Sequence, residues 1–63
     1  MHVKEINNDA YLVVAAKYWD KYGMDAFVDR VCWDLEEAKY VRSSLERADG
    51  MSFVIIKGGK EIW

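Results

Sequence analysis

Cys32 and His2 are the two side chains that could act as a thiol nucleophile and its base. Cysteine catalysis needs a base within hydrogen-bond reach of the thiol and a third group that orients the base. Each residue is the only one of its type, the two are expected on separate strands, and no orienting group is evident. We therefore expect Cys32 to be a buried strand residue that behaves as a small hydrophobe. A lone histidine also falls short of the three or four ligands of a metal site, so no metal site is expected.

Two further patterns have structural explanations. Gly58-Gly59 has neither the Lys-Ser/Thr continuation nor the following helix of a phosphate-binding loop, so it predicts a hairpin turn. Glu36 and Glu37 are adjacent, and adjacent side chains diverge on a helix, so they do not flank one reacting atom. We therefore expect a protein that is not an enzyme, with no catalytic residue, no cofactor and no small-molecule substrate.

Aromatic residues interleaved with basic ones are typical of proteins that stack on single-stranded nucleic acid. The aromatic residues are Tyr18, Trp19, Tyr22, Trp33, Tyr40 and Trp63, and the basic ones are Lys17, Lys21 and Arg30. No RNP-like glycine-aromatic motif is present, and nine basic against eleven acidic side chains give a net charge of −2. This balance argues against nucleic acid, which usually needs a basic excess. Core and interface aromatics are the preferred interpretation, and a small nucleic-acid-binding module is the alternative.

Acidic residues are concentrated in the middle of the chain. Six of the eleven acids lie between positions 20 and 37: Asp20, Asp25, Asp29, Asp34, Glu36 and Glu37. A solvated face is the ordinary explanation. The sharper hypothesis is an acidic ridge that occupies a basic groove on another protein, with Asp29 and Glu36 as partner contacts.

The segment from Trp33 to Gly50 predicts a helix from Asp34 to Ala48. Asp34 and Glu37 have the spacing of a capping box, and Gly50 suits the left-handed residue that ends a helix. Apolar residues recur at spacings of three and four, which places them on one helix face: Leu35, Ala38, Val41, Leu45 and Ala48. Arg42 and Glu46 can pair at i,i+4.

The rest of the chain predicts strands. Met1–Ile6 alternates weakly, and Asn7-Asn8-Asp9 predicts a turn. The expected strands are Ala10–Trp19, Phe27–Trp33, Ser52–Lys57 and Lys60–Trp63, with hairpin connections at Asp20–Asp25 and Gly58-Gly59. The predicted fold is α+β: a small antiparallel β-sheet in ββ(β)-α-ββ order, with one helix packed on one face.

A rival interpretation replaces the first strands by helices. Asn8 could cap a helix that ends at Gly23, and a second helix could run from Asp25 through Leu45. Six residues fit the helical spacing of the first: Tyr11, Val14, Ala15, Tyr18, Trp19 and Tyr22. Leu12 and Val13 fall off this stripe, and the VDRVCW segment is a poor helix former. Strands are therefore preferred for 9–22 and 25–33, with helices as the open alternative.

The predicted strands are apolar on both faces. In a two-residue hairpin Val54 opposes Trp63, so Val54, Ile56 and Trp63 share one face while Phe53, Ile55 and Ile62 share the other. One helix covers only one side of such a sheet. We therefore expect a homodimer or a protein partner on the second face, with Trp63, Val54, Ile56 and Trp19 as contacts.

Sixty-three residues allow one domain, 1–63, of the size that often gains stability by association. The single cysteine and the absence of a long apolar run favour the cytoplasm and argue against a membrane span. In size and element order, judged on the helix and the terminal hairpin, the chain resembles the small accessory proteins of bacteriophages and other mobile elements. Many of those proteins inhibit host or defence enzymes, although the resemblance assigns no residues. The predicted function is a small non-enzymatic protein–protein interaction module, such as an inhibitor, that acts through an apolar sheet face or the acidic ridge.

Overall fold

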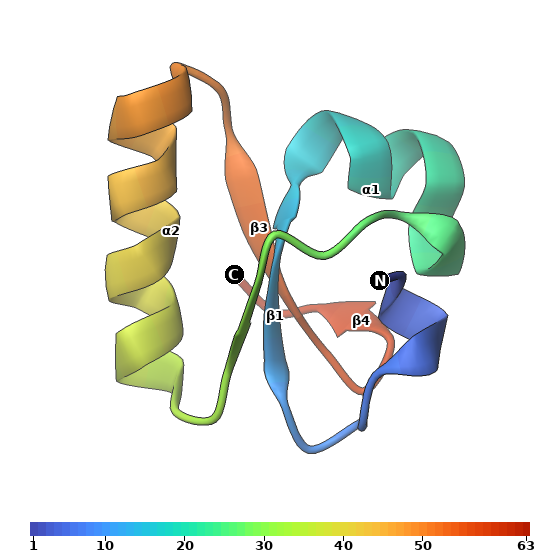
Figure 1. Ribbon diagram of the computed structural model, residues 1–63. Coiled ribbons are helices and arrows are strands. Elements are labelled where there is room, and N and C mark those ends of the chain that lie inside the picture. The colour runs from blue at the N-terminus through green and yellow to red at the C-terminus, as the bar shows by residue number, and fades with distance from the viewer.

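The computed structural model describes residues 1–63 and has four strands, two α-helices and two short 3-10 turns. In chain order they are η1 (Val3–Glu5), β1 (Tyr11–Ala15), α1 (Ala16–Tyr22), η2 (Gly23–Asp25), β2 (Arg30–Cys32), α2 (Leu35–Asp49), β3 (Phe53–Lys57) and β4 (Lys60–Glu61). The strands form one antiparallel sheet in the order β2-β1-β3-β4, with α2 on one face and α1 on the other (Figure 1). The predicted α+β fold with a small antiparallel sheet is confirmed.

The β3–β4 hairpin has the predicted turn. Lys57 pairs with Lys60 and Ile56 with Glu61, which leaves Gly58 and Gly59 as the two connecting residues. Their φ angles are 60° and 77°, as a primed turn requires at both central positions. Glycine is favoured at both because a side chain would clash in this conformation.

Helix α2 is the predicted helix to within one residue at each end. It ends at Gly50, whose φ is 67° and whose N–H donates to the Glu46 carbonyl at 2.9 Å. Ala38 and Val41 from the predicted stripe are buried against the sheet. The capping box at the start is not formed, because the Asp34 side chain makes no cap hydrogen bond and only its carbonyl accepts, from the Ala38 N–H.

The predicted strand over Ala10–Trp19 is confirmed only for Tyr11–Ala15, and the predicted hairpin connection at Asp20–Asp25 is wrong. Strand β1 stops at Ala15, level with Phe53, the first residue of β3, and the last hydrogen bond to that side runs from Ala16 N–H to the Ser52 carbonyl. Past this point the chain has no partner strand, so it forms α1, which satisfies its own backbone groups and packs Trp19 against the core. The rival helix from Asn8 is also wrong in its start, although a helix does end at Gly23, whose φ is 57°.

The outer parts of the sheet are shorter than predicted. Strand β2 covers Arg30–Cys32 within the expected Phe27–Trp33, and the rival second helix from Asp25 does not form there. The Met1–Ile6 segment contains a 3-10 turn in place of a strand. One bridge between His2 and Phe27 ties it to the chain before β2, supported by a hydrogen bond from Val3 N–H to the Ala26 carbonyl at 3.0 Å.

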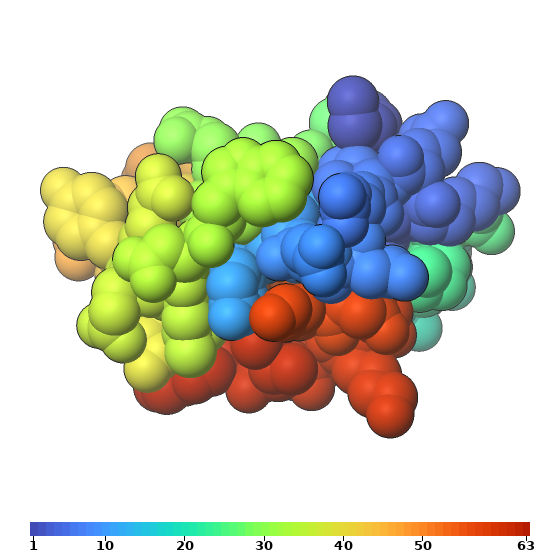
Figure 2. All heavy atoms as spheres, turned by 90° about the horizontal axis from the view of Figure 1, so that it is seen from below, coloured from blue at the N-terminus to red at the C-terminus, as the bar shows by residue number.

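Both faces of the sheet are apolar, as predicted, and each covers a separate core. On the α2 side the buried residues are Val13, Ala15, Cys32, Ala38, Val41, Phe53 and Ile55. On the α1 side they are Val3, Ala10, Leu12, Val14, Ala26, Val28, Val54 and Ile56. The expectation that this second face is left open within one chain is wrong, because the N-terminal segment, α1 and the chain before β2 cover it from within. Seen from below, the N-terminal segment, the segment entering α2 and the C-terminal hairpin pack closely side by side (Figure 2).

Arg42 and Glu46 join α2 to the first residue of β3. The Arg42 Nε donates to the Phe53 carbonyl at 2.7 Å, and the Phe53 N–H donates to the Glu46 carboxylate at 2.9 Å. Their side chains also form the expected i,i+4 ion pair at 3.6 Å. Strand β4 is too short to reach Phe53, so the two side chains replace the hydrogen bonds that a longer strand would make.

Candidate functional site

The apolar residues predicted to contact a partner do not form an exposed surface. Val54 and Ile56 are buried in the α1-side core, with 9% and 0% of their surface exposed. Trp19 packs against that same core and is half-buried. A partner therefore does not reach Val54 and Ile56 without opening the domain, and it reaches only part of Trp19.

Trp63 lies on the face opposite to the predicted one. The Ile62 N–H donates to the Ile55 carbonyl. The Ile55 N–H, however, donates to the Trp63 carbonyl, where a regular hairpin would use the Ile62 carbonyl. This pattern is that of a β-bulge, in which two consecutive residues oppose one and the alternation of side chains is broken. Trp63 is thereby directed to the α2 side, where its ring lies 4.1 Å from the Lys39 ammonium and 5.8 Å from the Arg42 guanidinium.

The predicted acidic contacts lie in different parts of the molecule. Glu36 is in the first turn of α2 and pairs with Lys39 at 3.7 Å. Asp29 precedes β2, and its carboxyl pKa is raised by partial desolvation and by Asp49 at the far end of α2, against the opposing effect of the Ala15 N–H. A helix of 15 residues spans about 22 Å, so the two acids face opposite ends of α2. The six acids therefore do not line one ridge.

Cys32 and His2 do not form a catalytic pair. Cys32 is buried in the α2-side core, where desolvation and then Glu37 raise the pKa of its thiol and so disfavour the thiolate. His2 lies on the other side of the sheet and is exposed, with its Nδ1 3.1 Å from the Glu5 carboxylate. No group of three or more His, Cys, Asp or Glu side chains comes together to hold a metal ion.

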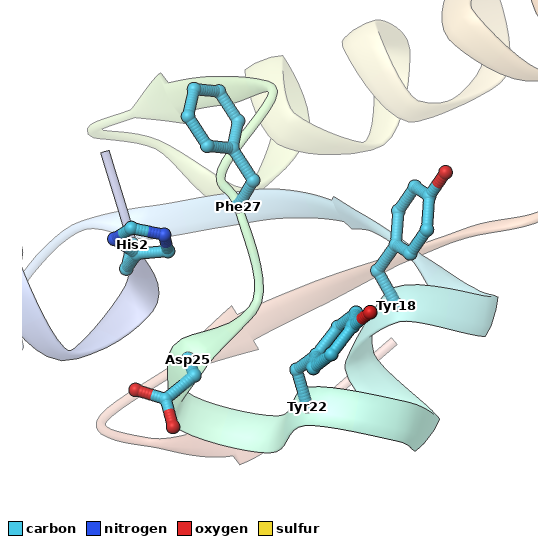
Figure 3. A pocket seen from close by; sticks show the side chains of 5 residues that line it. All are labelled: His2, Tyr18, Tyr22, Asp25 and Phe27. Carbon is cyan, nitrogen blue, oxygen red and sulfur yellow. The ribbon is translucent and has the colours of Figure 1, made fainter.

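The strongest candidate for a functional site is a hollow on the α1 side of the domain, which we call the aromatic hollow. It has a volume of about 300 Å³, opens to solvent and is lined by His2, Tyr18, Tyr22, Asp25 and Phe27 (Figure 3). The aromatic side chains are well exposed: 43% for Tyr18, 50% for Tyr22 and 58% for Phe27. Exposed aromatic rings around one concavity are the kind of surface that proteins use for recognition.

One wall of the aromatic hollow comes from α1. Tyr18 and Tyr22 are four residues apart and therefore lie on one face of the helix, with their rings stacked at 6.3 Å. Ala16 and Trp19 take the inward positions and pack on the core, which leaves the two tyrosines outside. Helix α1 has only seven residues, too few to be stable alone, so the packing of Trp19 against the core holds the tyrosine wall in place.

The opposite wall is built by the N-terminus and the chain before β2. The ring of His2 meets that of Phe27 edge to face, with 5.9 Å between the centroids. The two residues are held together by their backbone bridge and by a hydrogen bond from the Val28 N–H to the Met1 carbonyl at 2.9 Å. As Figure 3 shows, the tyrosine pair and Phe27 border a common space, and Asp25 lies at its edge with its carboxylate pointing outward.

The charges around the hollow come from short-range pairs. Asp25 pairs with Lys4 at 2.6 Å, and the hydrogen bond and charge of Lys4 lower the pKa of the Asp25 carboxyl. The His2 N–H donates to Glu5 at 2.7 Å, and this bond, with the His2 side chain, lowers the pKa of Glu5. Both carboxylates are therefore charged at neutral pH. Asp25 is the one formal negative charge in the lining.

Part of this site could be predicted from the sequence. Tyr18 and Tyr22 belong to the predicted aromatic set, and their i,i+4 spacing was noted within the rival helix. His2 and Phe27 were missed, because residues 25 apart come together only through the bridge that closes this face of the domain. Asp25 belongs to the acidic cluster of the sequence, and no local signal places it beside aromatic rings.

Comparison with known proteins gives no further guide: no family model, curated protein or solved structure matches the chain. Neither helix is long and apolar enough to cross a membrane.

Proposed function

We propose that the protein is a small non-enzymatic interaction module that binds another protein through the aromatic hollow. The main support for this proposal is the contrast between the two buried cores and the exposed aromatic rings of the hollow. Nearly all of the branched aliphatic side chains are buried in two clusters or packed against them, yet three aromatic rings are left exposed around one concavity. Tyrosine and phenylalanine present large contact areas at low conformational cost, which favours them at binding sites.

The rigidity of the two walls supports recognition. Each wall is a pair of rings in contact, anchored by the half-buried Trp19 on one side and by backbone hydrogen bonds on the other. A preformed hollow loses little conformational entropy when a partner enters. A concavity of about 300 Å³ suits one or two side chains of a partner protein as anchors.

The homodimer, the cytoplasmic location and the role as an inhibitor stay predictions. The argument for a homodimer loses its main premise, since Val54 and Ile56 are covered within one chain. An inhibitor role is compatible with a module that binds by one hollow, provided that the partner site is a functional one. The hollow, rather than a sheet face or an acidic ridge, is the surface on which these proposals now rest.

Selection from a peptide library tests the proposal without knowledge of the natural partner. A random library displayed on phage is selected on the immobilised protein and counter-selected on a variant with Tyr18→Ser, Tyr22→Ser and Phe27→Ser. We expect enriched peptides that bind the native protein at least 10-fold more tightly than the variant. Tyr40→Ser is the matched control, because Tyr40 is a tyrosine of α2, 71% exposed, that lies outside the hollow.

Two results would overturn the proposal. One is the absence of any enriched peptide family; the other is a set of peptides that bind the triple variant as well as the native protein. The variants replace exposed side chains, so circular dichroism should show an unchanged fold. If the triple variant fails to fold, Tyr22→Ser and Phe27→Ser are used singly with the same criteria.

A second candidate function is the binding of single-stranded nucleic acid, and the tyrosine wall favours it. Lys17 and Lys21 lie beside Tyr18 and Tyr22, with ammonium-to-ring distances of 5.2 Å and 5.3 Å. Bases could stack on the rings while the lysines contact phosphates. Fluorescence anisotropy with a labelled oligouridine tests this: binding that weakens as salt rises and on Lys17→Gln with Lys21→Gln would support it.

A further inference from the structure

We propose that the aromatic hollow receives a cationic side chain of the partner protein, and that its preferred guest is the guanidinium group of an arginine. This inference rests on the proposed function and specifies the chemistry of the same site. It depends on three features of the hollow: the aromatic walls, the single carboxylate in the lining, and the position of the neighbouring lysines.

The walls of the hollow offer π surfaces to a flat guest. The Tyr18–Tyr22 pair lies across from the His2–Phe27 pair, and Figure 3 shows an open space between the tyrosine rings and Phe27. Ring faces carry negative electrostatic potential and attract cations, most often arginine. A guanidinium group is planar and weakly hydrated, so it stacks on such rings at a lower cost of desolvation than an ammonium group.

Asp25 supplies the charge that selects a cation. Asp25 is the one acidic residue in the lining, and its carboxylate points away from the rings and pairs with Lys4 at 2.6 Å (Figure 3). Both side chains are well exposed, 64% for Asp25 and 59% for Lys4, and exposed ion pairs of this kind are weak. Because the Asp25 side chain is exposed, its rotation toward the rings would let an incoming arginine replace Lys4 and form a two-pronged hydrogen bond that an ammonium cannot form.

Lys17 and Lys21 distinguish a cationic guest from a nucleic acid. Neither lysine lines the hollow, although each lies close to a tyrosine ring. Their ammonium groups lie within the distance of a cation–π contact with these rings. They also add positive charge near the hollow, which opposes a cationic guest and favours an anionic one. Removal of the two lysine charges should therefore act in opposite directions on the two kinds of ligand.

Titration with small probes, followed by NMR of the aromatic side chains, tests the guest directly. The probes are N-acetyl-arginine amide, N-acetyl-citrulline amide, which has nearly the same shape without the charge, and N-acetyl-lysine amide. We expect saturable shifts of the Tyr18, Tyr22 and Phe27 ring signals with the arginine probe, at a dissociation constant on the order of millimolar for one side chain. Citrulline should bind at least 5-fold more weakly, and lysine should fall between the two.

Variants connect the binding to the named residues. Tyr22→Leu and Asp25→Asn should each weaken binding of the arginine probe about 3–5-fold, the factor expected for one exposed cation–π or charged contact. Tyr40→Leu should leave it unchanged. Lys17→Gln with Lys21→Gln should tighten it about 2-fold, whereas it should weaken the binding of oligouridine.

The outcomes separate this inference from the proposed function. Equal binding of citrulline and arginine, or an unchanged affinity in both Tyr22→Leu and Asp25→Asn, would refute the cationic guest. If the peptide selection still yields binders that depend on the hollow but contain no arginine, the interaction module stands and its proposed specificity falls. If the arginine probe binds as expected but no peptide is enriched, the site chemistry stands and the function as a peptide-binding module falls.

Discussion

Replacement of Glu46 by methionine tests whether the side chains of α2 complete the hydrogen bonding of β3. The carboxylate accepts the Phe53 N–H at 2.9 Å, at a residue that is 2% exposed, so its loss leaves a backbone donor with neither a protein partner nor ready access to water. An unsatisfied buried donor costs about 1–3 kcal/mol. Methionine has a similar length and a good helix propensity, so the effect does not come from the helix itself.

We expect Glu46→Met to lower the free energy of unfolding by about 1.5 kcal/mol. A domain of this size has a total stability of only about 3–9 kcal/mol. The loss corresponds to a fall of about 6–12 °C in the melting temperature, since 1 kcal/mol shifts a domain of 60–100 residues by about 4–8 °C. Thermal melts followed by circular dichroism measure the change, and hydrogen exchange of the Phe53 amide reports the hydrogen bond itself.

Glu46→Gln is the matched control for this experiment. The amide oxygen of glutamine can still accept the Phe53 N–H, whereas the ion pair with Arg42 at 3.6 Å is lost. Such a partly exposed ion pair is worth at most about 1 kcal/mol, so the glutamine variant should be the more stable of the two. The reasoning is refuted if both variants melt within 1 °C of the native protein while the Phe53 amide keeps its protection.

Three further predictions concern single residues. Asp29→Asn should raise the melting temperature slightly at pH 7, because the pKa of Asp29 is raised in the folded state and its ionisation therefore costs stability. This gain should vanish once the pH falls below the pKa of the carboxyl in the unfolded state. Thermal melts between pH 3 and 7 would show the change. Gly50→Ala should cost about 1 kcal/mol, because φ is 67° there and no atom would meet the new methyl group; Gly50→Asn should cost less, and urea titration measures both. Cys32 should react with a thiol reagent much more slowly in the native state than in urea, since it is 1% exposed and its pKa is raised; equal rates in the two conditions would contradict its burial.

Local chemistry in the second half of the chain was sufficient to predict helix α2, strand β3 and the turn of the terminal hairpin, although not the face on which Trp63 lies. Helix α2 follows from an apolar stripe at helical spacing and from Gly50, which adopts the left-handed conformation that ends a helix. The terminal hairpin follows from Gly58-Gly59, because two consecutive positive φ angles almost require glycine. In these segments the signals at neighbouring positions agree, so the fold class could be derived before any tertiary contact was known.

The conformation of residues 10–28 could not be predicted from the sequence alone, because their side chains suit either a strand or a helix. The change from β1 to α1 after Ala15 depends on where β3 begins, which is a fact about a segment almost 40 positions away. The same change turns Trp19 inward and Tyr18 and Tyr22 outward. The aromatic hollow then forms where α1 faces the His2–Phe27 bridge, a contact between residues 25 apart in the chain. The sequence determined which segments are apolar on two faces, whereas the path of the chain decided what covers the second face and which rings remain exposed.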